Sequence, residues 1–94
     1  MNSPDQTTAA NEARVPLAFV ATGSVVVLVE LGNGIDSMQR EQLTSYGLTP
    51  NRSISVLQQR PMTVILADEV ELALEHQVAR HIWVEPVPNA RNGN

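Results

Sequence analysis

Residues 36–50 carry the signals for both the start and the end of one helix. Asp36 is a favourable N-cap, because its carboxylate can accept hydrogen bonds from the free backbone amides of the first turn. Gly47 suits the left-handed conformation just past a helix, and Leu48 can then close on the last turn in a Schellman cap. Pro50 prevents the helix from continuing. The sequence therefore predicts one short helix, and every other element must lie on either side of it.

The segments around this helix have the alternating or β-branched patterns of short strands. Residues 75–80 are long enough for one helical turn. The predicted strands cover residues 25–31 before the helix and residues 53–57, 62–67, 70–74 and 81–85 after it. About five strands, one inserted helix and one helical turn make a mostly β fold, because closing a sheet into a small, partly open barrel removes exposed edges.

The ordered domain is predicted to span residues 15–87. Residues 1–14 and 88–94 are polar and bury too little apolar surface to offset their ordering entropy, so we expect two disordered tails. The valine-rich run at residues 25–29 is apolar on both faces, which predicts that both faces are covered. One face can line the barrel, and the other is expected to meet the helix, a terminal segment or another subunit.

Composition argues against several classes of function. The chain has no cysteine, so it has no disulfide, thiolate metal site or cysteine nucleophile, which suits a cytoplasmic location. Its formal net charge is −4 and its six basic residues are all arginine, a balance that argues against nucleic-acid binding. The sequence has no signal-peptide pattern, no apolar run that could span a membrane and no catalytic motif. We therefore expect a non-enzymatic domain that does not insert into a membrane.

Two patterns in the sequence resemble the FeoA family. The first is an arginine–leucine helix that runs into a glycine–leucine–x–proline turn. The second is an alanine–leucine…alanine…isoleucine–x–valine pattern in the last helical turn and strand. The residues that carry them are Arg40, Leu43, Tyr46, Gly47, Leu48 and Pro50, and Ala73, Leu74, Ala79, Ile82 and Val84. Leu17 and Gly23 also fit the family's opening, so the resemblance covers about residues 15–87.

The resemblance implies an SH3-like barrel and a role as a cytosolic accessory to bacterial ferrous-iron uptake. It also implies a partner, the membrane transporter that carries a cytosolic GTPase domain, and no required cofactor. The same fold forms the C-terminal domain of iron-dependent repressors, where it binds peptide or protein segments. The alternative hypothesis is therefore a stand-alone regulatory domain, which senses a divalent metal or acts as a homo-oligomer.

Three side chains are candidates for binding a partner. Arg40 can bind an acidic partner or a phosphate, or it can pair with Asp36 or pin the helix to the barrel. Trp83 is predicted on the outer face of its strand, where an aromatic residue suits an interface, or packed beneath Leu17 and Phe19. The ring of Tyr46 is expected in the core with its hydroxyl at the surface.

A metal site is the second candidate. His76 with Glu75 or Glu71 could bind ferrous iron or another divalent cation through a carboxylate-rich, octahedral site. His81 is not predicted to join them, because residues five apart on a helix lie on different faces. The alternative interpretation is that both histidines face solvent or cap a helix.

Overall fold

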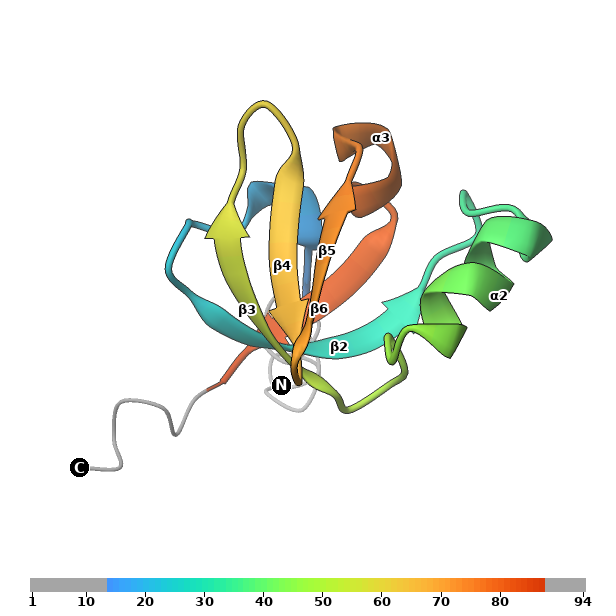
Figure 1. The fold of residues 1–94 in the computed structure, drawn as a ribbon, viewed down its shortest axis with the longest axis horizontal. Coiled ribbons are helices and arrows are strands. Elements are labelled where there is room, and N and C mark those ends of the chain that lie inside the picture. The colour runs from blue at the N-terminus through green and yellow to red at the C-terminus, as the bar shows by residue number, and fades with distance from the viewer. Residues whose placement is uncertain (1–13, 88–94) are drawn as a thin grey trace, which may run out of the picture.

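The computed structural model describes residues 14–87, which form one antiparallel sheet with an inserted helix (Figure 1). Six strands lie in the order β1-β6-β2-β3-β4-β5. Their bounds are Val15–Pro16 (β1), Val25–Leu31 (β2), Ser53–Gln58 (β3), Thr63–Ala67 (β4), Val70–Leu74 (β5) and Ile82–Pro86 (β6). The helical segments are the 3-10 turn η1 (Leu17–Phe19), α2 (Ser37–Ser45) and α3 (His76–Ala79). The two predicted tails lie outside the described residues, except for Arg14.

The predicted mostly β, SH3-like fold is confirmed, with one strand more than expected. The additional strand is β1, which is two residues long and pairs with β6 through Val15 opposite Val84 and Pro16 opposite Trp83. Such a short strand has no alternation to reveal it in the sequence. The other strands and both α-helices lie where the patterns predict them, within a residue or two at each end.

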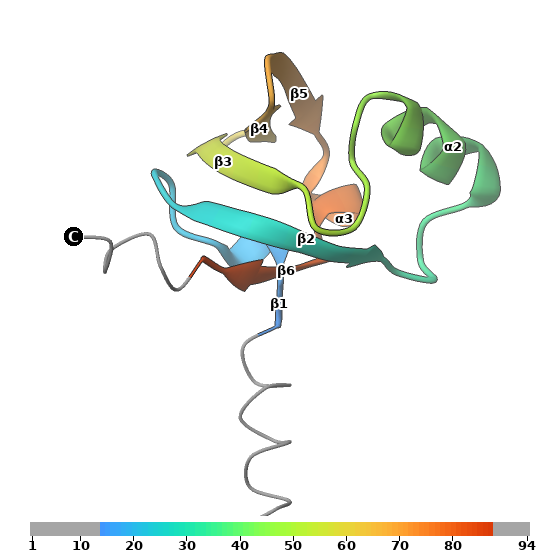
Figure 2. The same ribbon diagram turned by 90° about the horizontal axis from the view of Figure 1, so that it is seen from below.

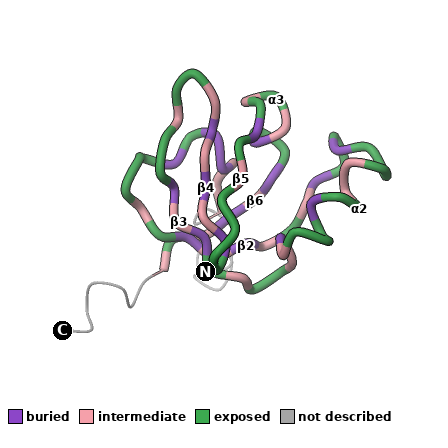
Figure 3. The backbone as a smooth tube through the Cα atoms, in the orientation of Figure 1, coloured by how far each residue is buried: buried purple, intermediate pink, exposed green. Residues whose placement is uncertain are grey.

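The sheet curls around a core built by alternation along the strands, with β2 and β6 on one side and β3 to β5 across from them (Figure 2). Burial therefore follows the inside of the curl (Figure 3). The large side chains that are fully buried are Leu17, Leu28, Leu48, Ile54, Val56, Ile65, Ile82 and Val84. Among the described residues, Thr63 is the buried polar side chain, and its hydroxyl donates to the Gln59 side-chain oxygen at 2.7 Å.

The outer face of β2 is less covered than its sequence predicts. Val26 and Leu28 point into the core, whereas Val27 and Val29 are half-buried and Val25 exposes 41% of its surface. The register with β6 shifts between Leu28 and Glu30, so a bulge redirects the strand before it ends. Part of the apolar cover expected on this face is thus missing from the single chain.

Helix α2 has the ends that the sequence predicts. The Gln39 amide donates to the Asp36 carboxylate at 2.8 Å, which caps the first turn. Gly47 has φ +104°, and the Leu48 amide donates to the Leu43 carbonyl at 3.0 Å, as in a Schellman cap. The helix stands beside the barrel at the end of β2 (Figure 1).

Helix α2 buries little apolar surface against the barrel. Leu43 is buried, but Met38 is 75% exposed and Tyr46 is 47% exposed. The prediction that the Tyr46 ring packs in the core is therefore wrong, because the helix approaches the barrel along one edge and not along its whole face.

Candidate functional site

A groove runs between α2 and the end of β2, and we call it the helix groove. Its volume is about 310 Å³. Its lining residues are Glu30, Leu31, Arg40, Thr44, Leu48, Thr49 and Pro50. The apolar lining residues are Leu31, Leu48 and Pro50, and the polar ones supply one carboxylate, one guanidinium and two hydroxyls. These features suit a protein segment that presents apolar side chains with a few polar groups.

Arg40 fixes one wall of the helix groove. Its guanidinium donates to the carbonyl oxygens of Leu31 and Gly32 at 2.8 Å and to that of Ile35 at 3.2 Å. These three carbonyls belong to the end of β2 and the connection to α2. Arg40 therefore pins the helix to the barrel, as the structural interpretation of this residue proposed.

Trp83 lies next to the same connection, on the outer face of the sheet. A Cβ atom placed on Gly32 would lie 3.0 Å from the indole nitrogen of Trp83, so the ring covers this glycine. On its other side the guanidinium carbon of Arg14 lies 5.8 Å from the ring centroid, and Arg14 also pairs with Glu30 at 2.9 Å. Trp83 is half-buried by these contacts.

The structure brings two of the three predicted partner-binding residues to one place. Arg40 holds the carbonyl of Gly32, while Trp83 covers its Cα. Tyr46 does not join them, because it is the C-cap at the far end of α2. Arg40 and Trp83 thus both contact the β2–α2 connection. Tyr46 is exposed and does not contact this connection.

The predicted metal ligands are not gathered into one site. Nε2 of His76 donates to the Gln59 backbone carbonyl, so this nitrogen is already engaged. Glu75 is the N-cap residue of α3, and Glu71 is exposed on β5. Within residues 14–87, no group of three or more His, Cys, Asp or Glu side chains could hold a metal ion. Metal binding by His76, Glu75 and Glu71 stays a prediction.

A small polar pocket between α2 and α3 contains a different pair of ligand-type side chains. Its volume is about 230 Å³. Its lining residues are Gly34, Ile35, Gln39, Glu75, Gln77, Val78 and His81. Sequence reasoning missed the pairing of Glu75 with His81, because the two face a common space only after the β2–α2 connection folds against them.

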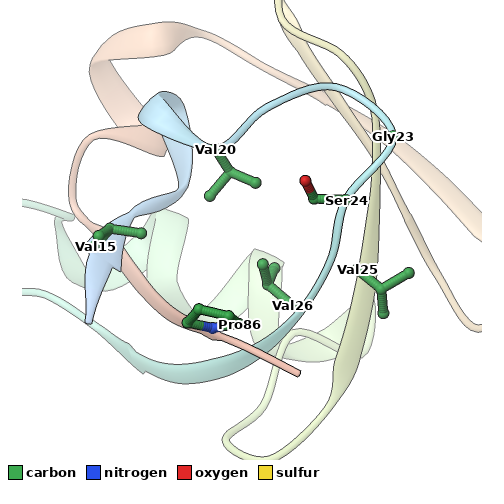
Figure 4. A pocket seen from close by; sticks show the side chains of 7 residues that line it. All are labelled: Val15, Val20, Gly23, Ser24, Val25, Val26 and Pro86. Carbon is green, nitrogen blue, oxygen red and sulfur yellow. The ribbon is translucent and has the colours of Figure 1, made fainter. Parts of the chain in front are cut away.

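A second groove, which the sequence did not predict, opens at the start of β2 (Figure 4). We call it the valine groove, and its volume is about 580 Å³. Its lining residues are Val15, Val20, Gly23, Ser24, Val25, Val26 and Pro86. It has no charged lining residue. Six of the lining residues lie within residues 15–26, and Pro86 completes the groove from the other end of the domain.

The described residues form a small, mostly β domain whose surface carries the helix groove, the valine groove and the polar pocket. The FeoA domain model matches residues 15–86, and the chain therefore belongs to the FeoA domain family. This confirms the resemblance seen in the sequence. The family is one of small non-catalytic domains associated with ferrous-iron transport. In the described residues, no helix has the length and apolarity that a membrane crossing needs.

Solved structures share the fold. The crystal structure of an iron uptake regulatory protein (FeoA) is 30% identical, with a TM-score of 0.67 over 79% of this chain and 97% of that one. A FeoA protein from Chlorobium tepidum is 17% identical, with a TM-score of 0.72 over 78% and 70% of the two chains. A manganese-dependent transcriptional repressor in complex with manganese is 19% identical, with a TM-score of 0.72, over 79% of this chain but 37% of its own. No curated protein matches the sequence.

Proposed function

We propose that this domain is a cytoplasmic, non-enzymatic accessory of bacterial ferrous-iron transport that binds the cytosolic part of the transporter. The observation that carries the proposal is the FeoA family match over residues 15–86, nearly all of the described chain. The transporter's GTPase-bearing region is the partner that the family resemblance implies. The helix groove is the surface that we assign to this contact.

The chemistry of the helix groove supports this assignment. Leu31 is half-buried and Pro50 is exposed, so both offer apolar surface to a partner's side chains. Arg40 makes three hydrogen bonds to carbonyls, so two of its five N–H groups remain to donate to a partner. A guanidinium held in this way is already ordered, and binding an acidic or carbonyl group costs it little further entropy.

A pair of matched variants tests the assignment. Thr44 is exposed on α2 and lines the helix groove, so Thr44→Arg fills the groove with a long charged side chain. Gln42 is also exposed on α2 but is not a lining residue, so Gln42→Arg makes the same charge change outside the groove. Calorimetry with the purified cytosolic part of the transporter should show binding by the wild type and by Gln42→Arg, and at least about tenfold weaker binding by Thr44→Arg. Absence of binding by the wild type contradicts the proposed function, and equal binding by both variants contradicts the assigned surface.

A second candidate function is the sensing of a divalent metal. The observation that favours it is that Glu75 and His81 line one polar pocket, since carboxylate and imidazole are both ligands of divalent transition metals. Anaerobic calorimetry with ferrous, manganous and zinc ions should then show binding that His81→Gln weakens. If the wild type shows no binding heat with any of these ions, the metal function is ruled out.

A further inference from the structure

An asparagine–glycine pair lies in the β2–α2 connection. Asn33 and Gly34 are the two central residues of a turn, which the Ile35 amide closes by donating to the Gly32 carbonyl at 3.3 Å. Both central residues are exposed, whereas Gly32 and Ile35 on either side of them are buried. The turn therefore holds the Asn33 side chain in water between two fixed ends.

The backbone nitrogen of Gly34 is available to react with this side chain. Among residues 14–87, no backbone carbonyl accepts a hydrogen bond from the Gly34 N–H. Gly34 also has no side chain of its own that could hinder approach to its nitrogen. A nucleophilic nitrogen thus directly follows a solvent-exposed asparagine whose side-chain carbonyl carbon it can attack.

We propose that Asn33 converts spontaneously to isoaspartate, and that this modification loosens α2 from the barrel. The Gly34 nitrogen bonds to Cγ of Asn33 and closes a five-membered succinimide ring, while the side-chain nitrogen leaves as ammonia with the proton of the Gly34 N–H. Water then opens the ring. Its attack at Cγ gives aspartate, and its attack at the main-chain carbonyl carbon gives isoaspartate.

Asn51 shows that exposure alone does not make an asparagine reactive in this way. It is exposed like Asn33, but the residue after it is Arg52 and not glycine. The Arg52 amide donates to the Thr49 carbonyl at 3.1 Å, so the nitrogen that would attack is already engaged. The Arg52 side chain also crowds that nitrogen. Asn51 should therefore keep its amide under conditions in which Asn33 loses it.

Isoaspartate adds one carbon atom to the main chain of a connection that is held on both sides. Arg40 bridges the turn, because its guanidinium donates to the carbonyls of Gly32 at 2.8 Å and Ile35 at 3.2 Å. The Gly32 amide donates to the His81 carbonyl at 2.7 Å, and Ile35 is only 3% exposed. A longer main chain between Gly32 and Ile35 moves these groups apart, so Arg40 cannot keep both hydrogen bonds.

The loss of these bonds acts on a helix that has few others to the barrel. Leu43 is the buried side chain of α2, and Arg40 supplies the hydrogen bonds from α2 to the end of β2. Aspartate at position 33 leaves the main chain unchanged and adds only a charge. The structural effect should therefore belong to isoaspartate and not to aspartate.

Peptide mass spectrometry of the aged full-length chain tests the modification. The sequence also contains Asn92–Gly93, the same dipeptide outside the described residues, and incubation continues until Asn92 has converted. The peptide with Asn33 should then contain aspartate and isoaspartate, and the peptide with Asn51 should keep its amide. Asn33→Gln should stay unmodified at this position, because glutamine would have to form a larger ring. An Asn33 that stays intact, or an Asn51 that converts as fast, overturns the proposal.

Hydrogen exchange of the purified isoaspartate form tests the structural effect. The amides of α2 should exchange faster than in the unmodified chain, with the central strands little changed. Asn33→Asp is the matched control, since it has the same charge on a normal main chain, and its α2 amides should exchange like those of the wild type. Equal protection of α2 in the isoaspartate form and in Asn33→Asp overturns the proposed loosening. Neither measurement involves the transporter, so both are independent of the proposed function.

Discussion

At the scale of single residues, Arg40 and Gly32 determine how the helix meets the barrel. Arg40 donates to three carbonyls at the end of β2 and in the β2–α2 connection. Gly32 lets Trp83 and the His81 carbonyl approach the chain closely. Both residues hold neighbouring segments of the chain in place. Replacing either one should therefore lower the free energy of unfolding.

Arg40→Gln should lower the free energy of unfolding by about 1–3 kcal/mol, because part-buried carbonyls lose their donors. Urea denaturation measures this change. Arg80→Gln is the matched control, since Arg80 is exposed at the end of α3, and it should stay within about 0.5 kcal/mol of the wild type. If Arg40→Gln were as stable as Arg80→Gln, the pinning role of Arg40 would be refuted.

Gly32→Ala should cost about 1–3 kcal/mol of unfolding free energy, because the new methyl group would lie 2.8 Å from the His81 carbonyl oxygen and 3.0 Å from the Trp83 nitrogen. Gly34→Ala provides the comparison. The three atoms nearest its methyl group, at 2.4–2.6 Å, all belong to the His81 side chain, which is exposed and can turn away. Thermal unfolding should therefore rank Gly32→Ala as clearly less stable than Gly34→Ala, and the reverse order would contradict this account.

At the scale of elements, α2 has hydrogen-bonded caps at both ends but buries few side chains against the barrel. Its two ends are fixed by local hydrogen bonds, and Leu43 is its buried side chain. Exposed Met38 and Tyr46 contribute little to the core. The helix therefore depends on its caps more than a helix with a broad buried face does.

Asp36→Ala removes the N-cap hydrogen bond and should cost about 0.5–2 kcal/mol, whereas Asp36→Asn should cost less because asparagine also caps helices. Hydrogen exchange should show the loss mainly at the amides of α2, with smaller changes in the central strands. An equal increase in exchange across the whole sheet would show instead that α2 is tightly coupled to the barrel.

The elements could be predicted from the sequence because their signals are local. The caps at Asp36 and Gly47, and the alternation around Ile54 and Ile65, depend on residues close in the chain. The short strand β1 was missed because it exists only through its pairing with β6. The burial of Tyr46 was mispredicted because periodicity does not say how far a helix lies from the sheet.

The candidate sites were predicted less completely than the elements. Arg40 and Trp83 stood out as single residues, but their shared contact with Gly32 depends on three segments. The Glu75–His81 pocket also joins residues 34–39 to residues 75–81, and the valine groove joins residues 15–26 to Pro86. Such sites are tertiary features, and local patterns contain no information about them.

At the scale of the whole molecule, the barrel presents different surfaces at the two ends of β2. The helix groove combines apolar and charged residues, which suits a partner that binds and releases. The valine groove has an uncharged lining. A domain of this size buries a limited core, so a bound partner can add to its stability.

The central claim is that the helix groove binds the cytosolic part of the ferrous-iron transporter. Its most direct test is an NMR titration of the isotope-labelled domain with that purified part of the transporter. The amides of Leu31, Thr44 and Leu48 should show saturable shifts, with those of Val20 and Val26 unchanged. An unchanged spectrum at saturating partner, or shifts confined to the valine groove, would contradict it.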